Sequence, residues 1–347
     1  MKSLLVLGAS GLMGRRVCAI AAKQLPDVRL IRASRSLTSS AETRRADHRD
    51  LDSLRKAFEG IDCVINAAGP YDYHPNKLLE ACFESRCHYV DLSESRAFHS
   101  GVAASARRWA PERRGLSWVP GASTVPGLIE VLTAAWSKDS RLKRIDAYLS
   151  LGSRNPTSRT LLYSLLEPIA GRAADGTEYF AGTLKRTSRD GKPLRYGRYA
   201  YPRDPDQNLD ANERLEHRFF VGFDRALYTR TLSWARPLLR ALPPDALRWS
   251  AAAARPLVSG LSLFGTRVGR LEVVALDASE TELGASWVIA ARQGLDIPAA
   301  PAVWAAARLL GPHAPPSGVR GLAELVPAQG ARDWLSQHGY VVGSRWS

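Results

Sequence analysis

The chain has 347 residues, of which 45% are hydrophobic and 24% charged. This composition is ordinary for a globular protein and excludes disordered, collagen-like and disulfide-scaffold classes, while the length predicts two domains. The net charge of +14 at pH 7 suits nucleic acid, an anionic membrane or an acidic substrate. No zinc-finger, basic-zipper or aromatic RNA-binding motif accompanies the charge, so we expect no nucleic-acid partner.

The compartment is predicted from the start of the chain and from the cysteines. No apolar run reaches the roughly 18 residues of a spanning helix, and the apolar segment after Met1 is too short for a signal peptide. We therefore expect a cytoplasmic protein. Cys18, Cys63, Cys82 and Cys87 all lie in the first quarter of the chain, which predicts buried reduced thiols and no metal site.

Residues 1–125 alternate short apolar runs with helical patterns, which predicts a parallel α/β sheet. We expect strands at Leu4–Leu7, Val28–Ala33, Arg44–His48, Ile61–Ala67, Tyr89–Leu92 and Leu116–Val119. We expect helices at Arg15–Lys23, Asp50–Glu59, Pro75–Ser85 and Ala97–Trp109.

The pattern changes after Pro126. Helices are expected at Leu128–Trp136, Ser158–Ala170 and Ala302–Leu310, a strand at Arg144–Leu151, and hairpins around residues 190–191 and 277–284. Residues 225–270 form a long helical stretch with eight arginines and one acid. The predicted fold is a Rossmann-type α/β domain over residues 1–125, an inserted α+β domain over 126–296, and a C-terminal helix and tail over 297–347 that return to the first domain.

A glycine-rich turn follows the first predicted strand and opens the first helix. The first glycine permits a tight turn, Gly11 lets the backbone approach a pyrophosphate, and Gly14 lets helix and strand pack closely. The N-terminus of the helix offers unpaired N–H groups and a partial positive charge to the phosphates. We expect the cofactor to contact Gly8, Ser10, Gly11, Leu12, Met13 and Gly14.

The end of the second strand distinguishes NADP(H) from NAD(H). About 20 residues beyond the glycines, an acid would bind the ribose hydroxyl of NAD(H). Here the chain has Ser34 and Arg35, which suit a 2′-phosphate, so we predict NADP(H) in preference to NAD(H). The other interpretation of Arg35 is one more surface arginine. Asp47 contacts the adenine amino group or caps the next helix; both stay open.

Two segments at later strand ends supply candidates for the chemistry. Ala67, Ala68, Gly69 and Pro70 are small enough for backbone to approach the ribose and nicotinamide. Tyr71 beside them either donates a proton or packs. Asp91 and Glu94 follow the fifth strand and either perform acid–base work or cap the next helix.

Five segments occur in the order seen in saccharopine dehydrogenase-like proteins, which this chain resembles over residues 1–130. They are Leu5–Gly11 with Gly14, Ala33–Ser36, Asn66–Tyr71, His88–Glu94 and Pro120–Pro126. A fainter resemblance covers residues 295–326. The resemblance implies a Rossmann domain, an inserted α+β domain, a returning C-terminal helix, NADP(H) or NAD(H) as cofactor, and reduction of imines or lipid-like enoyl compounds. The family often has Gly-Phe-Asp before the Val-Pro element, whereas this chain has Gly-Ala-Ser-Thr, so the substrate is not carried over.

The leading hypothesis is an NADP(H)-dependent oxidoreductase that acts on a C=N, C=C or C=O bond of a small or lipid-like substrate in a cleft between the domains. A second hypothesis is an NADP(H)-sensing regulator without catalysis. A third is a membrane-surface or partner-binding protein that uses the basic helices of residues 225–270. A homodimer and peripheral membrane contact stay open.

Overall fold

The computed structural model describes residues 1–109, 115–171, 176–202, 215–312, 315 and 317–346. The chain divides into two compact units. Unit 1 comprises Met1–Val131 and Leu295–Gly330, and unit 2 comprises Leu132–Gly294 and Ala331–Ser347. The chain therefore leaves unit 1 after Val131, returns to it at Leu295, and leaves it again after Gly330.

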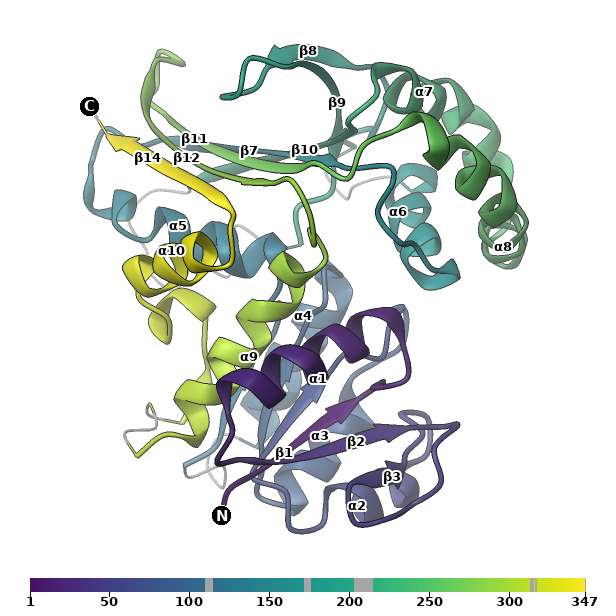
Figure 1. The fold of residues 1–347 in the computed structure, drawn as a ribbon, viewed down its shortest axis with the longest axis vertical. Helices are drawn as coiled ribbons and strands as arrows, with labels where there is room; N and C mark the ends of the chain where they lie inside the picture. The colour runs from purple at the N-terminus through teal and green to yellow at the C-terminus, as the bar shows by residue number, and fades with distance from the viewer. Residues whose placement is uncertain (110–114, 172–175, 203–214, 313–314, 316, 347) are drawn as a thin grey trace. The chain divides into compact units, whose positions relative to one another are not determined.

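Unit 1 is built on a parallel sheet whose strand order is β13-β6-β5-β4-β1-β2-β3. Its strands β1, β2 and β3 are labelled in Figure 1. The strands are β1 Ser3–Leu7, β2 Arg29–Ser34, β3 Thr43–Arg45, β4 Cys63–Asn66, β5 His88–Asp91, β6 Ser117–Val119 and β13 Gly318–Val319. Every residue of β1 and β4 is buried, as expected for central strands of a parallel sheet. The order reverses between β1 and β4, where the doubly wound fold leaves a crevice for ligands.

Helices cover both faces of this sheet. They are α1 Leu12–Gln24, α2 Leu51–Phe58, α3 Asn76–Glu84, α4 Arg96–Arg108 and α9 Asp296–Leu310, followed by α10 Ala328–Gln337 at the boundary to unit 2. Phe58, Leu79 and Phe98 place α2, α3 and α4 in one buried core with the sheet. The small side chains of α9, such as Ala299 and Ala302, are buried and let it pack against α1, β4 and β5.

Unit 2 contains a mixed sheet in the order β14-β12-β11-β7-β10-β9-β8. The strands are β7 Arg144–Leu151, β8 Leu184–Thr187, β9 Pro193–Tyr199, β10 Glu216–Phe223, β11 Gly269–Leu276, β12 Glu282–Ala290 and β14 Val341–Trp346. Strands β7 and β10 pair in parallel, and the other pairs are antiparallel. The predicted hairpin turn at Asp190-Gly191 joins β8 to β9, with Gly191 at φ +77°.

The helices of unit 2 are α6 Arg159–Ala170, α7 Ala226–Ala241 and α8 Pro244–Leu261. Its shorter helical segments are η2 Trp136–Lys138 and η4 Ser262–Phe264. Unit 1 holds η1 Thr124–Leu128 and η5 Leu322–Glu324, and α5 Ile129–Thr133 spans the boundary between the units. Helix α7 contacts β9, β10 and α6 (Figure 1).

The predicted α/β fold is confirmed by the parallel sheet of unit 1 and its helices. One part of the predicted architecture is wrong. The tail over residues 297–347 does not pack entirely on the first domain, because β14 pairs antiparallel with β12 of unit 2 and Trp346 stacks on Trp136 with ring centroids 5.3 Å apart. Only the portion up to Gly330 belongs to unit 1.

Candidate cofactor site

The register of the sheet in unit 1 brings the predicted site segments to one edge. Leu7 is aligned with Ala33 on β2 and with Asn66 on β4, and Asn66 is aligned with Asp91 on β5. Because parallel strands end at the same edge, the residues that follow these positions lie side by side. The glycine turn, Ser34 and Arg35, the Ala67–Pro70 loop and Asp91 are therefore neighbours at the carboxyl edge of the sheet.

The glycine turn has the geometry that its sequence predicts. Gly8 adopts φ +81°, a conformation that favours glycine, and its N–H donates to the Ala33 carbonyl at 2.8 Å. A Cβ atom on Gly14 would lie 2.1 Å from the Gly8 carbonyl oxygen, so only glycine lets α1 start this close to the turn. Gly11 is exposed, and a Cβ there would meet Gly8 O at 3.1 Å.

The N-terminus of α1 is suited to an anion. The helix begins at Leu12 with no side-chain cap and no acid in its first turn, so the first N–H groups, including that of Met13, lack intrahelical acceptors. The Arg15 guanidinium donates to the Ser10 carbonyl and adds positive charge at the same place. Unpaired N–H groups, the helix dipole and a cation together match a pyrophosphate.

The end of β2 presents an exposed guanidinium. Ser34 is buried with its Oγ 3.2 Å from that of Ser36, whereas Arg35 is exposed and makes no ion pair within the described part of the chain. The nearby Arg32 is paired with Glu42 at 3.2 Å and so is less free to bind a ligand. This environment favours a 2′-phosphate over a ribose hydroxyl.

Asp47 lies after β3 and does not cap α2, so one of its two interpretations is wrong. Its Oδ1 accepts from the Arg49 N–H at 3.0 Å. The cap of α2 is Asp50, whose carboxylate accepts from the Asp52 and Ser53 N–H groups at 3.1 and 3.3 Å. The contact of Asp47 with adenine stays a prediction.

The Ala67–Pro70 loop is held against the glycine turn by its neighbours. A Cβ on Gly8 would lie 2.8 Å from the Ala68 nitrogen, which measures how closely the two loops approach. Asn66 organises the loop: its Oδ1 accepts from the Ala68 N–H at 3.1 Å, and its Nδ2 donates to the Tyr73 and Tyr89 hydroxyls, each at 3.0 Å. Sequence reasoning missed this role, although a fully buried asparagine at a strand end was a signal for it.

Tyr71 sits close to the loop with its hydroxyl already engaged. The hydroxyl donates to the Asn66 carbonyl at 2.8 Å, and the ring packs edge-on against Phe98 with centroids 5.1 Å apart. Burial raises the pKa of the phenol well above its usual value, with the charge of Asp91 as a smaller cause. The proton of Tyr71 is therefore held in a structural hydrogen bond.

Asp91 and Glu94 differ sharply in environment, and neither caps α4, whose N-cap is Ser95. Asp91 is fully buried, and its Oδ1 accepts from the N–H groups of Ser93 and Gly121, both at 2.9 Å. Burial raises the pKa of Asp91 to about 6, although the two N–H groups act in the opposite direction. Glu94 has side-chain surface exposed to solvent, which leaves it the more accessible carboxylate of the pair, while partial burial of its carboxyl group raises the pKa of Glu94 to about 7.

The predicted buried, reduced thiols agree with the structure. All four cysteines are free thiols and buried, and burial is the main cause that raises the pKa of Cys18 to about 11. Within the residues that the structure describes, no group of three or more His, Cys, Asp or Glu side chains is placed to hold a metal ion.

Comparison with known proteins identifies the first part of the chain. Residues 4–115 match the family described as saccharopine dehydrogenase NADP binding domain. This match confirms the predicted family resemblance and, for the domain, NADP(H) as the cofactor.

Two similar proteins extend beyond this domain. A probable mitochondrial saccharopine dehydrogenase-like oxidoreductase of Arabidopsis thaliana is 30% identical over 175 residues, which are 43% of this chain and 38% of that protein. The match therefore spans well under half of the relative. The structure of apo saccharopine dehydrogenase (L-Glu forming) from Saccharomyces cerevisiae matches all of both chains with a TM-score of 0.58 at 15% identity, which shows a common fold.

Proposed function

We propose that this chain, whose residues 4–115 match the saccharopine dehydrogenase NADP binding domain family, is an NADP(H)-dependent oxidoreductase. The observation that carries the proposal is the Gly8–Gly14 turn, with an uncapped helix N-terminus behind it and the exposed Arg35 beside it. The similarity to an oxidoreductase of Arabidopsis thaliana supports the same class of activity.

The residues present fit the cofactor. The first N–H groups of α1 hold the pyrophosphate, since no side chain caps them and the backbone at Gly11 is open to solvent. Arg35 would hold the 2′-phosphate, and the small residues Ala67 and Ala68 would let the nicotinamide ribose approach the backbone. The bound nicotinamide supplies or accepts a hydride, so the protein has only to orient the substrate and to move one proton.

The proton is assigned to Glu94. In reduction, a C=N, C=C or C=O bond gains a hydride at one atom and a proton at the other, and Glu94 is the exposed carboxylate next to β5. Tyr71 and Asp91 are positioning residues in this account, because the first fixes the Asn66 carbonyl and the second fixes the backbone at Gly121. The substrate is a small or lipid-like molecule with one of these three bonds.

Turnover with a panel of imine, enoyl and carbonyl compounds tests the proposal, with NADPH oxidation followed by absorbance. We expect Glu94→Gln to lower kcat by at least about 100-fold while the Kd for NADPH changes less than about twofold, as for loss of a proton-transfer group. Arg96→Gln, at an exposed position two residues later, is the matched control. A Glu94→Gln variant with wild-type kcat would remove Glu94 from the mechanism.

A second function has a specific observation in its favour. The hydroxyl of Tyr71 and the carboxylate of Asp91 are both engaged with main-chain groups, which fits a protein that binds NADP(H) and signals its presence without catalysis. NADPH binding without turnover on any member of the panel would favour this regulator over the enzyme.

A further inference from the structure

Helix α7 of unit 2 exposes large apolar side chains and buries a charged one, the reverse of an ordinary surface helix. Its Leu227, Trp234 and Leu238 side chains are 59%, 69% and 67% exposed, and they fall on one side of the helix at spacings of seven and four residues. The opposite side buries Arg236, which pairs with Glu178 at 2.9 Å. A helix in water normally buries its apolar side chains and exposes its charges, so this face is built to be covered.

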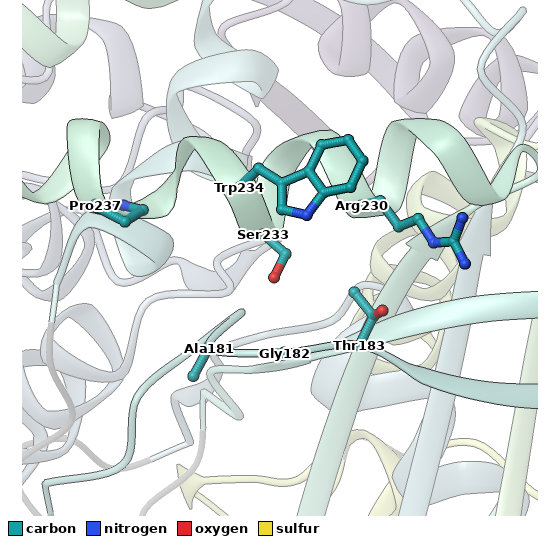
Figure 2. Close-up of a pocket in the computed structure, with 7 residues that line it drawn as sticks. All are labelled: Ala181, Gly182, Thr183, Arg230, Ser233, Trp234 and Pro237. Atoms are coloured by element: carbon teal, nitrogen blue, oxygen red, sulfur yellow. The ribbon is translucent and has the colours of Figure 1, made fainter.

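The exposed face of α7 borders an open groove of about 510 Å³ (Figure 2). One wall consists of Arg230, Ser233, Trp234 and Pro237, which are successive neighbours along α7. The other wall is the segment 181–183, which precedes β8. The groove therefore combines a guanidinium, hydroxyl groups and an indole, and its volume lies in the range of sites for small molecules.

The helix that carries this face is positively charged. Helix α7 carries Arg230, Arg236 and Arg240 and no acid. Glu178 pairs with Arg236 and with Arg240, both at 2.9 Å, whereas Arg230 at the groove makes no ion pair in the ranges that the structure describes. The free guanidinium is thus the one beside the exposed indole, where it can meet an anion.

Further apolar surface adjoins the start of α7. The Arg225 Nε donates to the Phe264 carbonyl at 2.8 Å, so the exposed Leu263 and Phe264 lie next to the first turn of the helix. We call the surface formed by Leu227, Arg230, Trp234, Leu238 and Phe264 the α7 face.

We propose that the α7 face docks on the surface of a membrane that contains anionic phospholipids. The lipid phosphate would occupy the groove beside Arg230, with Trp234 at the level of the head groups and the leucines among the upper acyl carbons. None of the helices in the described part of the chain is long and apolar enough to cross a bilayer, which fits docking on one leaflet.

Charge complementarity favours this occupant over a second copy of the chain. In a two-fold dimer the same patch meets itself, so Arg230 of each copy would face the α7 face of the other, whose five defining residues include no acid. A leaflet of anionic lipid instead supplies both the negative charge and an apolar layer.

Vesicle flotation with the full chain tests the proposal. We expect the protein to float with vesicles of phosphatidylglycerol and phosphatidylcholine in equal parts and to remain behind with phosphatidylcholine alone. Binding should fall at least tenfold at high salt, since screening weakens attraction between exposed charges. Soluble glycerol phosphate at the same phosphate concentration should not compete, which distinguishes a membrane from a free phosphate.

Two variants locate the contact, and two controls match them. Trp234→Ser with Leu238→Ser removes apolar surface, Arg230→Gln removes the free charge, and each should lower vesicle binding at least tenfold. Val341→Ser and Arg292→Gln, at exposed positions of unit 2 outside the α7 face, should bind as the wild type does. Because every substituted side chain is exposed, thermal unfolding should be unchanged in all four variants.

Three results of the flotation experiments would overturn the proposal. They are the absence of wild-type binding to the anionic vesicles at low salt, unchanged binding of both variants, and competition by soluble glycerol phosphate. A concentration-dependent dimer that Trp234→Ser with Leu238→Ser dissociates would overturn it too, because a second copy would then cover the face. Lipid binding is read without NADPH, so failure here leaves the proposed oxidoreductase activity untouched.

Discussion

Gly14→Ala is the substitution whose effect follows most directly from the geometry of unit 1. The added Cβ would lie 2.1 Å from the Gly8 carbonyl oxygen, 2.7 Å from the Gly8 carbonyl carbon and 2.8 Å from the Ala9 Cα. All three atoms belong to the backbone, so no side chain can rotate away. Helix α1 would have to move by about 1 Å to restore normal contact distances.

The cost of this movement can be bounded. Overpacking in a dense region costs about 1–3 kcal/mol, and alanine in a helix returns about 0.5–1 kcal/mol relative to glycine. We therefore expect Gly14→Ala to lower the free energy of unfolding by up to about 2.5 kcal/mol. The same movement displaces the first N–H groups of α1 from the pyrophosphate, so the Kd for NADPH should rise at least about tenfold, equivalent to about 1.4 kcal/mol.

Urea unfolding and NADPH titration measure the two effects. Gly330→Ala is the control, because Gly330 lies in α10 and a Cβ there meets nothing within 4 Å. That variant should gain up to about 1 kcal/mol and bind NADPH normally. If Gly14→Ala unfolds at the wild-type urea concentration and binds NADPH with wild-type affinity, the close approach of α1 to the turn has no role in binding.

Two further predictions concern the loops beside the cofactor site. Asp91 has a folded pKa of about 6, above its unfolded value near 3.8, so its protonation favours the folded state and its contribution is lost as pH rises from about 4 to about 6. The control is Asp91→Asn, which keeps an acceptor for the Gly121 N–H. When the pH is lowered from 6.5 to 4.5, the free energy of unfolding of the wild type should rise by about 2 kcal/mol more than that of the variant. Equal rises in both proteins would show that Asp91 has an ordinary pKa. Tyr71→Phe should lower the free energy of unfolding by about 1 kcal/mol, because it removes the hydrogen bond from the Tyr71 hydroxyl to the Asn66 carbonyl. A fall in kcat of about 100-fold or more at unchanged stability would instead make Tyr71 the proton donor.

Local rules predicted the cofactor turn well. Gly8 needs a positive φ and Gly14 needs the absence of a Cβ, and both requirements are visible in the spacing of glycines after a buried strand. The position of Ser34 and Arg35 at the end of β2 was equally predictable, because it follows from the local strand pattern alone. The contact of Arg35 with the 2′-phosphate stays a prediction.

Long-range pairing explains what the sequence did not predict. Strand β14 is exposed along most of its length and has little hydrophobic pattern, so only its register with β12 identifies it as a strand. The role of Asp91 depends on the Gly121 N–H, which lies 30 residues further along the chain. The exposure of apolar side chains on α7 was likewise not predictable, because sequence alone does not say that Arg236 is buried and Trp234 exposed.

Calorimetric titration of NADPH and NADH tests the central claim most directly. The wild type should bind NADPH more tightly than NADH, and Arg35→Ala should weaken NADPH binding at least about tenfold, as for loss of a charge-assisted hydrogen bond, while NADH binding stays within about twofold. Arg32→Ala, whose guanidinium is paired with Glu42 in the wild type, should leave both affinities unchanged. Failure of both nucleotides to bind, or an Arg35→Ala variant that keeps the preference for NADPH, would contradict the account.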